Sequence, residues 1–142
     1  MGNLELLKDN KILITGSNGL LGQKLVKTFI EDYEILGIDQ SKSSALNLTD
    51  LPYLPCDITR RSEVQELIRS FKPNFIINAA AYTDVDGCEE DKENCWKVNV
   101  TGPEILARVG RRHGSLLVHI STDYVFDGVK GNYTEESTPN PL

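Results

Sequence analysis

Short apolar runs alternate along the chain with segments whose apolar residues recur at helical spacing. The runs predict five strands, at residues 11–15, 34–39, 53–58, 75–78 and 115–120. The helical segments lie at residues 21–30, 64–71 and 90–113. This alternation favours right-handed crossovers. It predicts an α/β fold with a doubly wound parallel sheet of strand order 3-2-1-4-5, covered by helices in three α/β/α layers.

Local signals predict where the helices begin and end. Asp57 or Thr59 can cap the second helix, and Lys72-Pro73-Asn74 stops it. Gly102-Pro103 interrupts the third, and Thr101 with Glu104 matches a capping box, so we expect a kink or a restart there. Trp96 falls on the apolar face of this segment and is predicted to lie in the core.

The glycine turn after the first strand is the main candidate site. Gly16, Gly19 and Gly22 follow the strand at three-residue spacing and lead into the first helix. Such a turn lets the backbone approach a pyrophosphate, and the helix N-terminus offers unpaired N–H groups. A glycine triplet also occurs in ordinary tight turns, but the strand before it and the helix after it favour a dinucleotide site.

The end of the second strand bears on the choice of cofactor. A carboxylate at the position of Asp39 accepts hydrogen bonds from the adenosine ribose, which favours NAD over NADP. Ser41 and Lys42 follow directly and can receive a 2′-phosphate. The choice between NADH and NADPH therefore stays open.

Two further strand ends carry small or hydroxyl side chains. Ala79-Ala80-Ala81 after the fourth strand suits either a flat ligand ring or tight helix packing. Ser121 and Thr122 after the fifth strand can hydrogen-bond a ligand in the crevice. Asn99, in the middle of a helix, is by pattern alone a solvated polar residue.

Composition narrows the class of protein. The 142 residues fit one domain, with 39% hydrophobic and 25% charged residues and a net charge of −6 that argues against nucleic acid as a partner. No apolar run is long enough to span a membrane, so a cytoplasmic protein is expected. The three cysteines, Cys56, Cys88 and Cys95, contain no CxxC pair, which predicts reduced thiols and neither a disulfide nor a metal site.

Several motifs together resemble the dTDP-4-dehydrorhamnose reductase family of extended short-chain dehydrogenases. They are Thr15-Gly-Ser-Asn-Gly-Leu-Leu-Gly22, Asn78-Ala-Ala-Ala-Tyr-Thr83, Val98-Asn99, Tyr133-Thr-Glu135, Pro139-Asn-Pro-Leu142 and, most specifically, Ser121-Thr-Asp-Tyr-Val-Phe-Asp-Gly128. The resemblance covers the whole chain. It implies a Rossmann-like NAD(P)-binding domain over residues 1–142 and reduction by NADH or NADPH of the C4 ketone of a dTDP-linked deoxysugar.

The resemblance also implies roles for individual residues. Thr122 would polarise the ketone as the hydroxyl member of the catalytic set, and Asp123 would lie beside the sugar. Asn99 would support the proton relay. The residues implied to border the cofactor are Gly16, Gly19, Leu20, Leu21, Gly22, Asp39, Asp57, Ile58, Ala81, Tyr82, Thr83, Asn99 and Ile120.

One element of the family's catalytic set is missing. The family's general acid is a tyrosine with a lysine four residues on, and none of the five tyrosines here has one. We therefore expect an N-terminal portion of such a reductase, truncated after the fifth strand, that keeps most of the cofactor site but does not turn over. The fifth strand would then be a bare sheet edge beside exposed apolar side chains, inviting self-association into a homodimer.

Two other readings stay open. Reductase-like regulatory subunits, such as that of methionine adenosyltransferase, resemble the same family and bind a dinucleotide without catalysis. The other alternative is a nucleotide-sugar epimerase or dehydratase of the same superfamily, and the Ser121–Gly128 motif argues against it.

Overall fold

The computed structural model describes residues 10–46 and 51–141. The predicted leader at residues 1–10 lies outside this part apart from Asn10. One parallel sheet runs in the order β3-β2-β1-β4-β5, which confirms the predicted topology. The strands are β1 (Lys11–Thr15), β2 (Glu34–Asp39), β3 (Tyr53–Pro55), β4 (Phe75–Asn78) and β5 (Leu116–His119). β3 and β5 are shorter than predicted.

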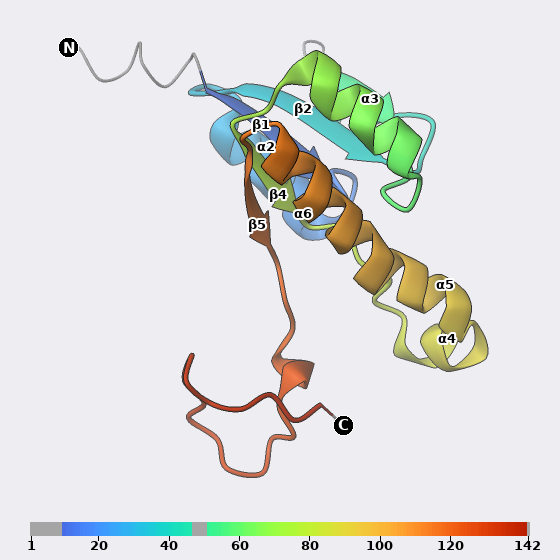
Figure 1. Ribbon diagram of the computed structural model, residues 1–142, viewed down its shortest axis with the longest axis vertical. Coiled ribbons are helices and arrows are strands. Elements are labelled where there is room, and N and C mark those ends of the chain that lie inside the picture. The colour runs from blue at the N-terminus through green and yellow to red at the C-terminus, as the bar shows by residue number, and fades with distance from the viewer. Residues whose placement is uncertain (1–9, 47–50, 142) are drawn as a thin grey trace, which may run out of the picture.

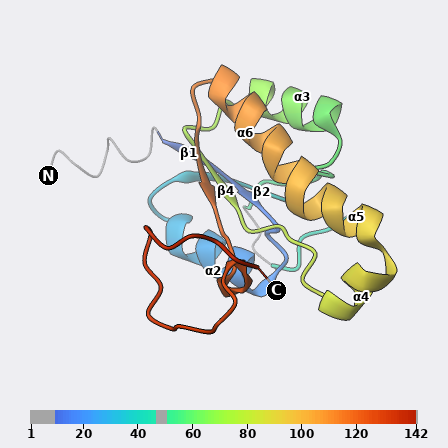
Figure 2. The same ribbon diagram turned by 60° about the horizontal axis from the view of Figure 1, so that its bottom comes forward.

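Helices cover both faces of the sheet. α3 (Arg61–Phe71) and α6 (Gly102–Arg112) pack on one face, and α2 (Leu20–Phe29) packs on the other (Figures 1 and 2). Two short helices, α4 (Val85–Glu90) and α5 (Lys92–Trp96), project beyond the end of the sheet (Figure 1). After β5 the chain forms one 3₁₀ turn, η2 (Asp123–Val125), and extends away from the sheet.

Alternating side chains divide the core into two halves. Leu13 and Ile76 point to the α3–α6 side and pack with Leu106 there. Ile12 and Ile14 point to the other face and pack with Val26 of α2. This period of two is what a strand buried on both faces requires. Leu21, predicted to share the buried face of α2, is exposed because it stands in the first turn beside the cleft described below.

The long helical segment is distorted where the sequence predicts a break. A π-helical turn, η1 (Lys97–Thr101), joins α5 to α6, and Pro103 lies in the first turn of α6. Proline cannot donate the backbone hydrogen bond that a continuous α-helix needs, and the π turn lies directly before Gly102 and Pro103. The capping-box prediction is wrong: Thr101 is itself helical and its side chain makes no capping bond.

The start of α3 also differs from the prediction. Arg60 is the N-cap and makes no side-chain capping bond. Asp57 instead accepts hydrogen bonds from the backbone N–H and the hydroxyl of Thr59, two residues on, which lies before the first turn of α3. At the other end Lys72 adopts a left-handed conformation (φ 55°) before Pro73, as the stop signal predicts.

The cysteine and tryptophan predictions fail in the α4–α5 region. Cys88 and Cys95 form a disulfide, because the chain reverses at Asp91 and brings their Cα atoms to 5.2 Å; only Cys56 is a free thiol among the described residues. Trp96 is 65% exposed rather than in the core, since α5 projects past the sheet. Helical periodicity marks a face and does not say what covers it.

β5 forms an edge of the sheet, as expected. Leu117 packs against the α3–α6 core, whereas its neighbours Leu116 and Val118 point to the other face and are exposed. Ile120, just beyond the strand, is exposed as well. In residues 10–46 and 51–141, no helix combines the length and apolar character that a membrane crossing needs.

Candidate functional site

The turn between β1 and α2 packs directly against the end of β4. Gly16 has φ +64°, and a Cβ there would lie 2.7 Å from the backbone N of Ala80. A Cβ on Gly22 would lie 2.1 Å from the carbonyl oxygen of Gly16. Position 16 therefore needs glycine for its left-handed backbone and for this close contact, and position 22 needs it for the close contact alone. The two glycines hold the turn and the first helical turn close to the sheet.

The N-terminus of α2 opens into the space above this turn. Gly19 is the N-cap and supplies no side-chain cap, and the first helical bond runs from the N–H of Gln23 to the carbonyl of Gly19 at 2.9 Å. The N–H groups of Leu20, Leu21 and Gly22 thus have no acceptor within the helix. Together with the positive end of the helix dipole they suit an anionic group such as a pyrophosphate.

Asp39 is tied to the same turn. Its Oδ2 accepts from the backbone N–H of Asn18 at 3.3 Å, and its Oδ1 accepts from the N–H and hydroxyl of Ser41, also at 3.3 Å. Ser17 is buried, and it donates both its hydroxyl and its backbone N–H to the carbonyl of Ile38, the residue before Asp39. These bonds fix an acidic group at the carboxyl end of β2, beside the glycine turn.

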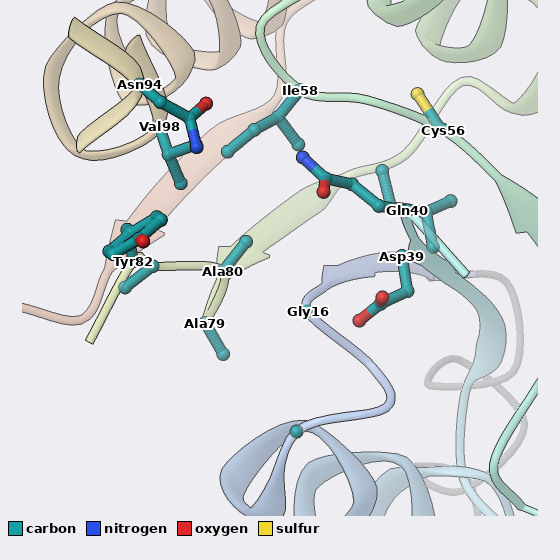
Figure 3. A pocket seen from close by; sticks show the side chains of 13 residues that line it. Gly16, Asp39, Gln40, Cys56, Ile58, Ala79, Ala80, Tyr82, Asn94 and Val98 are labelled. Atoms are coloured by element: carbon teal, nitrogen blue, oxygen red, sulfur yellow. The ribbon is translucent and has the colours of Figure 1, made fainter. Parts of the chain in front are cut away.

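A cavity of about 280 Å³ lies at the carboxyl ends of β1, β2 and β4. Asp39 and Gln40 line one side, Gly16 lies at its base, and Tyr82 and Val98 stand opposite (Figure 3). The other residues that line it are Gly19, Ile38, Cys56, Ile58, Ala79, Ala80, Ala81 and Asn94. Apolar side chains such as Ile58 and Val98, with the acid Asp39 opposite, suit a base and its ribose.

A larger open cleft of about 980 Å³ continues from the helix N-terminus to the chain after β5. Gly19 and residues 79–82 line both spaces, so the two lie side by side. The predicted Thr122 and Asp123 lie here. Thr122 donates its hydroxyl to Asp123 at 3.3 Å and accepts from the N–H of Tyr124 at 3.2 Å. The hydroxyl can exchange its exposed aspartate partner for a ligand without leaving a buried group unpaired.

Asn99 connects the π-helical turn to the floor of the cleft. Its Oδ1 accepts from the N–H of Tyr82 at 2.8 Å, and its Nδ2 donates to the carbonyl of Tyr82 at 3.0 Å. The side chain is not a solvated polar residue of a helix surface, as pattern alone suggested. It holds the main chain that lines both spaces.

A row of polar side chains ties three strand ends together beneath the cleft. Thr15 donates to Asn78, the backbone N–H of Ala80 donates to Thr15 Oγ1, and Asn78 Nδ2 lies 2.9 Å from His119 Nδ1. Thr15 and Asn78 are fully buried, so these bonds satisfy polar groups that would otherwise be costly. The row fixes the spacing of β1, β4 and β5 at the site.

Burial shifts the pKa of two groups near the smaller cavity. Burial, with the nearby acids Glu63 and Asp57, raises the pKa of the Cys56 thiol to about 11. Burial and the charge of Asp39 also raise the pKa of Tyr53, whose hydroxyl donates to the carbonyl of Ser41. Both groups are therefore neutral at pH 7, and Cys56 is a lining group rather than a nucleophile.

Of the residues predicted to border the cofactor, all but one line these spaces. Gly16, Asp39 and Ile58 line the smaller one, and Leu20, Leu21, Gly22, Thr83, Asn99 and Ile120 line the larger, while Gly19, Ala81 and Tyr82 line both. Asp57 lines neither, because its carboxylate turns to Thr59 and Arg60.

Several lining residues were not among those predicted to border the cofactor. Gln40 follows Asp39 directly and could have been found from its place at the strand end. Asn94 and Val98 reach the cavity from the α5–η1 segment, four residues apart on one helical face. Only the fold reveals that this face meets the sheet end.

Comparison with known proteins gives a consistent family. The model of the family described as "RmlD substrate binding domain" matches residues 10–142. The chain is 44% identical over 135 residues to a dTDP-4-dehydrorhamnose reductase from Aggregatibacter actinomycetemcomitans, covering 93% of this chain and 42% of that protein. It is 36% identical to methionine adenosyltransferase 2 subunit beta from Xenopus laevis, covering 99% and 42%.

A solved structure shows the same fold. The dTDP-4-dehydrorhamnose reductase of Bacillus anthracis in complex with NADP superposes with a TM-score of 0.80 at 34% identity, covering 93% of this chain and 43% of that one. The chain thus spans less than half the length of each of these three proteins.

Proposed function

The chain belongs to the RmlD substrate binding domain family, and from this premise we propose that it is the NAD(P)H-binding domain of a dTDP-4-dehydrorhamnose reductase. The reaction reduces the C4 ketone of dTDP-4-dehydro-6-deoxy-L-mannose to dTDP-L-rhamnose. The cofactor, when bound, supplies the hydride. The observation that carries the proposal is the pair of adjacent spaces that meet at the α2 N-terminus, with Asp39 in one and Thr122 in the other.

The residues present fit a dinucleotide. Glycine at positions 16 and 22 lets the turn lie close against the sheet end, and the N–H groups of the first α2 turn would face the anionic oxygens of a pyrophosphate. Asp39 offers its carboxylate to ribose hydroxyls. Ile58 and Val98 give an apolar wall for the base.

The far end of the cleft suits the sugar. Thr122 would donate its hydroxyl to the ketone oxygen, where negative charge grows as hydride arrives. Asp123, whose carboxylate already accepts from Thr122, would receive a sugar hydroxyl. Asn99 would keep the Tyr82 main chain in place beneath the nicotinamide end.

This chain contains no Tyr-x-x-x-Lys pair that could deliver a proton to the product oxygen. We therefore propose that the chain alone binds cofactor and does not turn over. A second candidate follows from the same observation and from the likeness to methionine adenosyltransferase 2 subunit beta: a dinucleotide-binding module that modulates a partner enzyme without catalysis.

Saturation-transfer NMR with NADH and the dTDP-linked ketosugar tests both proposals. The expected result is transfer to the adenine protons of NADH, competition by ADP-ribose, and no loss of NADH absorbance over time. Transfer to the sugar-nucleotide as well favours the reductase; cofactor signals alone, with a gain of activity in added methionine adenosyltransferase, favour the regulatory module. Absence of any transfer contradicts both.

A further inference from the structure

The disulfide between Cys88 and Cys95 lies outside the functions discussed so far. It joins α4 to α5 across the reversal at Asp91, with the two Cα atoms 5.2 Å apart. That separation is within the usual range for disulfides. Both cysteines are half-buried, so a small thiol reagent can reach them.

The disulfide touches the group that holds the floor of the cleft. Cys95 Sγ lies 3.4 Å from Asn99 Nδ2, the same atom that donates to the carbonyl of Tyr82. Cys88 Sγ lies 4.0 Å from that carbonyl and lines the larger cleft. Both sulfur atoms therefore contact the Tyr82–Asn99 pair.

Apart from the disulfide, exposed surface contacts hold α4 against α5. The two helices have six and five residues, and none of their residues, all within the described part of the chain, is buried. A helix as short as α4 is unstable in water without tertiary support, whereas α5 continues directly into η1. The other contacts of the pair include the exposed capping bonds of Asp84 to Gly87 and of Asp91 to Asn94, each 3.1 Å. An exposed ion pair of 3.0 Å also joins Glu89 of α4 to Lys92 of α5.

We propose that Cys88 and Cys95 form a reversible thiol–disulfide site that takes low-molecular-weight thiols and disulfides as reactants, and whose oxidised form fixes Tyr82 through Asn99. Opening the disulfide releases the α4–α5 pair and loosens the Asn99 bonds to Tyr82. The consequence for cofactor affinity rests on the proposed function, whereas the redox site and its effect on Tyr82 do not.

The chemistry is a two-electron exchange with glutathione. One cysteine thiolate attacks glutathione disulfide, forms a mixed disulfide and releases one glutathione thiolate. The second cysteine thiolate attacks the protein sulfur of that mixed disulfide and releases the other. The protein dithiol is oxidised, glutathione disulfide is reduced to two thiols, and the two protons lost by the cysteines pass to the two leaving thiolates.

The first arm of the test counts thiols. The protein is equilibrated in glutathione buffers of graded redox ratio, quenched in acid, unfolded and labelled with a thiol reagent. The chain has three cysteines, so we expect Cys56 alone to be labelled at the oxidising end and all three at the reducing end. Labelling of all three throughout would overturn the proposal.

The second arm measures hydrogen exchange at the backbone N–H of Tyr82, which Asn99 protects. We expect exchange about fivefold slower in the oxidised protein, at the lower end of usual coupling between sites. The Cys88→Ser/Cys95→Ser double variant is the control and should match the reduced protein at every redox ratio. Equal exchange in oxidised and reduced wild type would overturn the proposal.

NADH affinity in both states separates this inference from the proposed function. A dissociation constant about fivefold lower in the oxidised state supports both. Redox-dependent exchange without NADH binding upholds the disulfide site and contradicts the proposed function. NADH binding that is equal in both states, together with equal exchange, leaves the proposed function standing and removes the redox site.

Discussion

Asn99 holds both polar atoms of the Tyr82 main chain, accepting from its N–H at 2.8 Å and donating to its carbonyl at 3.0 Å. The two residues lie 17 positions apart, Tyr82 in the loop after β4 and Asn99 in η1. This pairing joins the π-helical turn to the floor of the cleft. It gives an otherwise ordinary helical asparagine a definite role in positioning the site.

Replacing this asparagine should therefore weaken cofactor binding without unfolding the protein. Asn99→Ala leaves the half-buried N–H of Tyr82 without its acceptor, a cost of about 1 kcal/mol, or about fivefold in the dissociation constant of NADH. Val100→Ala, at an exposed neighbour in the same turn, is the control and should change affinity little. Equal affinities for the two variants would mean that Tyr82 needs no such support.

The glycine turn makes a prediction about stability. Gly22→Ala places a methyl group 2.1 Å from the Gly16 carbonyl oxygen, where backbone cannot yield, and should lower the free energy of unfolding by about 3 kcal/mol. Gly114→Ala is the matched control: its φ is +76° but nothing lies within 4 Å, so only the conformational cost of about 1 kcal/mol applies. Denaturant midpoints compare the two. Similar losses would contradict the close packing.

The segment after η2 carries a pH-dependent contact. Hydrogen bonds from the Tyr133 hydroxyl, the N–H of Val129 and the Asn140 amide lower the pKa of Asp127 to about 2. Because the folded pKa lies below the ordinary value of about 3.9, the contact is complete above that value and is lost as pH falls toward 2. Carbon NMR of the carboxyl should give this low pKa, and Tyr133→Phe should raise it. A pKa near 3.9 in the wild type would rule the contact out.

The exposed edge at β5 predicts self-association. Leu116 and Val118 are exposed on the face away from α3 and α6, at an edge with unpaired backbone groups. Val118→Lys should shift the chain toward monomer, because a charged edge side chain opposes strand pairing. Lys substitution at exposed Val129, which lies outside the sheet, is the control. Sedimentation at high concentration checks this, and a wild type that stays monomeric there would contradict it.

Periodicity and strand ends predict most of this fold from the sequence. Apolar runs locate the five strands, and their alternation with helices sets the strand order. Since ligands of such sheets bind at the carboxyl ends, the Gly16–Gly22 turn and Asp39 follow from the same pattern. These features depend on short-range sequence signals.

The failures share a different cause. Trp96, the Cys88–Cys95 disulfide and the bonds of Asn99 all depend on how the α4–α5 segment projects past the sheet end. Helical spacing identifies an apolar face of this segment but not the absence of a neighbour to cover it. Cysteine spacing likewise says nothing of a chain reversal at Asp91. Such relations arise only from tertiary packing.

The proposed cofactor site is tested most directly by isothermal titration of the chain with NADH and NADPH. The same titrations are made on Asp39→Ser and on a control, Glu31→Ala, at an exposed acid past the far end of α2. The wild type should bind NADH. Asp39→Ser should lose affinity for NADH and gain affinity for NADPH, because the carboxylate at the end of β2 repels a 2′-phosphate. The ratio of the two dissociation constants should change by about tenfold. Glu31→Ala should leave both affinities unchanged. Heat of binding absent for both cofactors, or a ratio insensitive to Asp39, would contradict the assignment of this cleft to a dinucleotide.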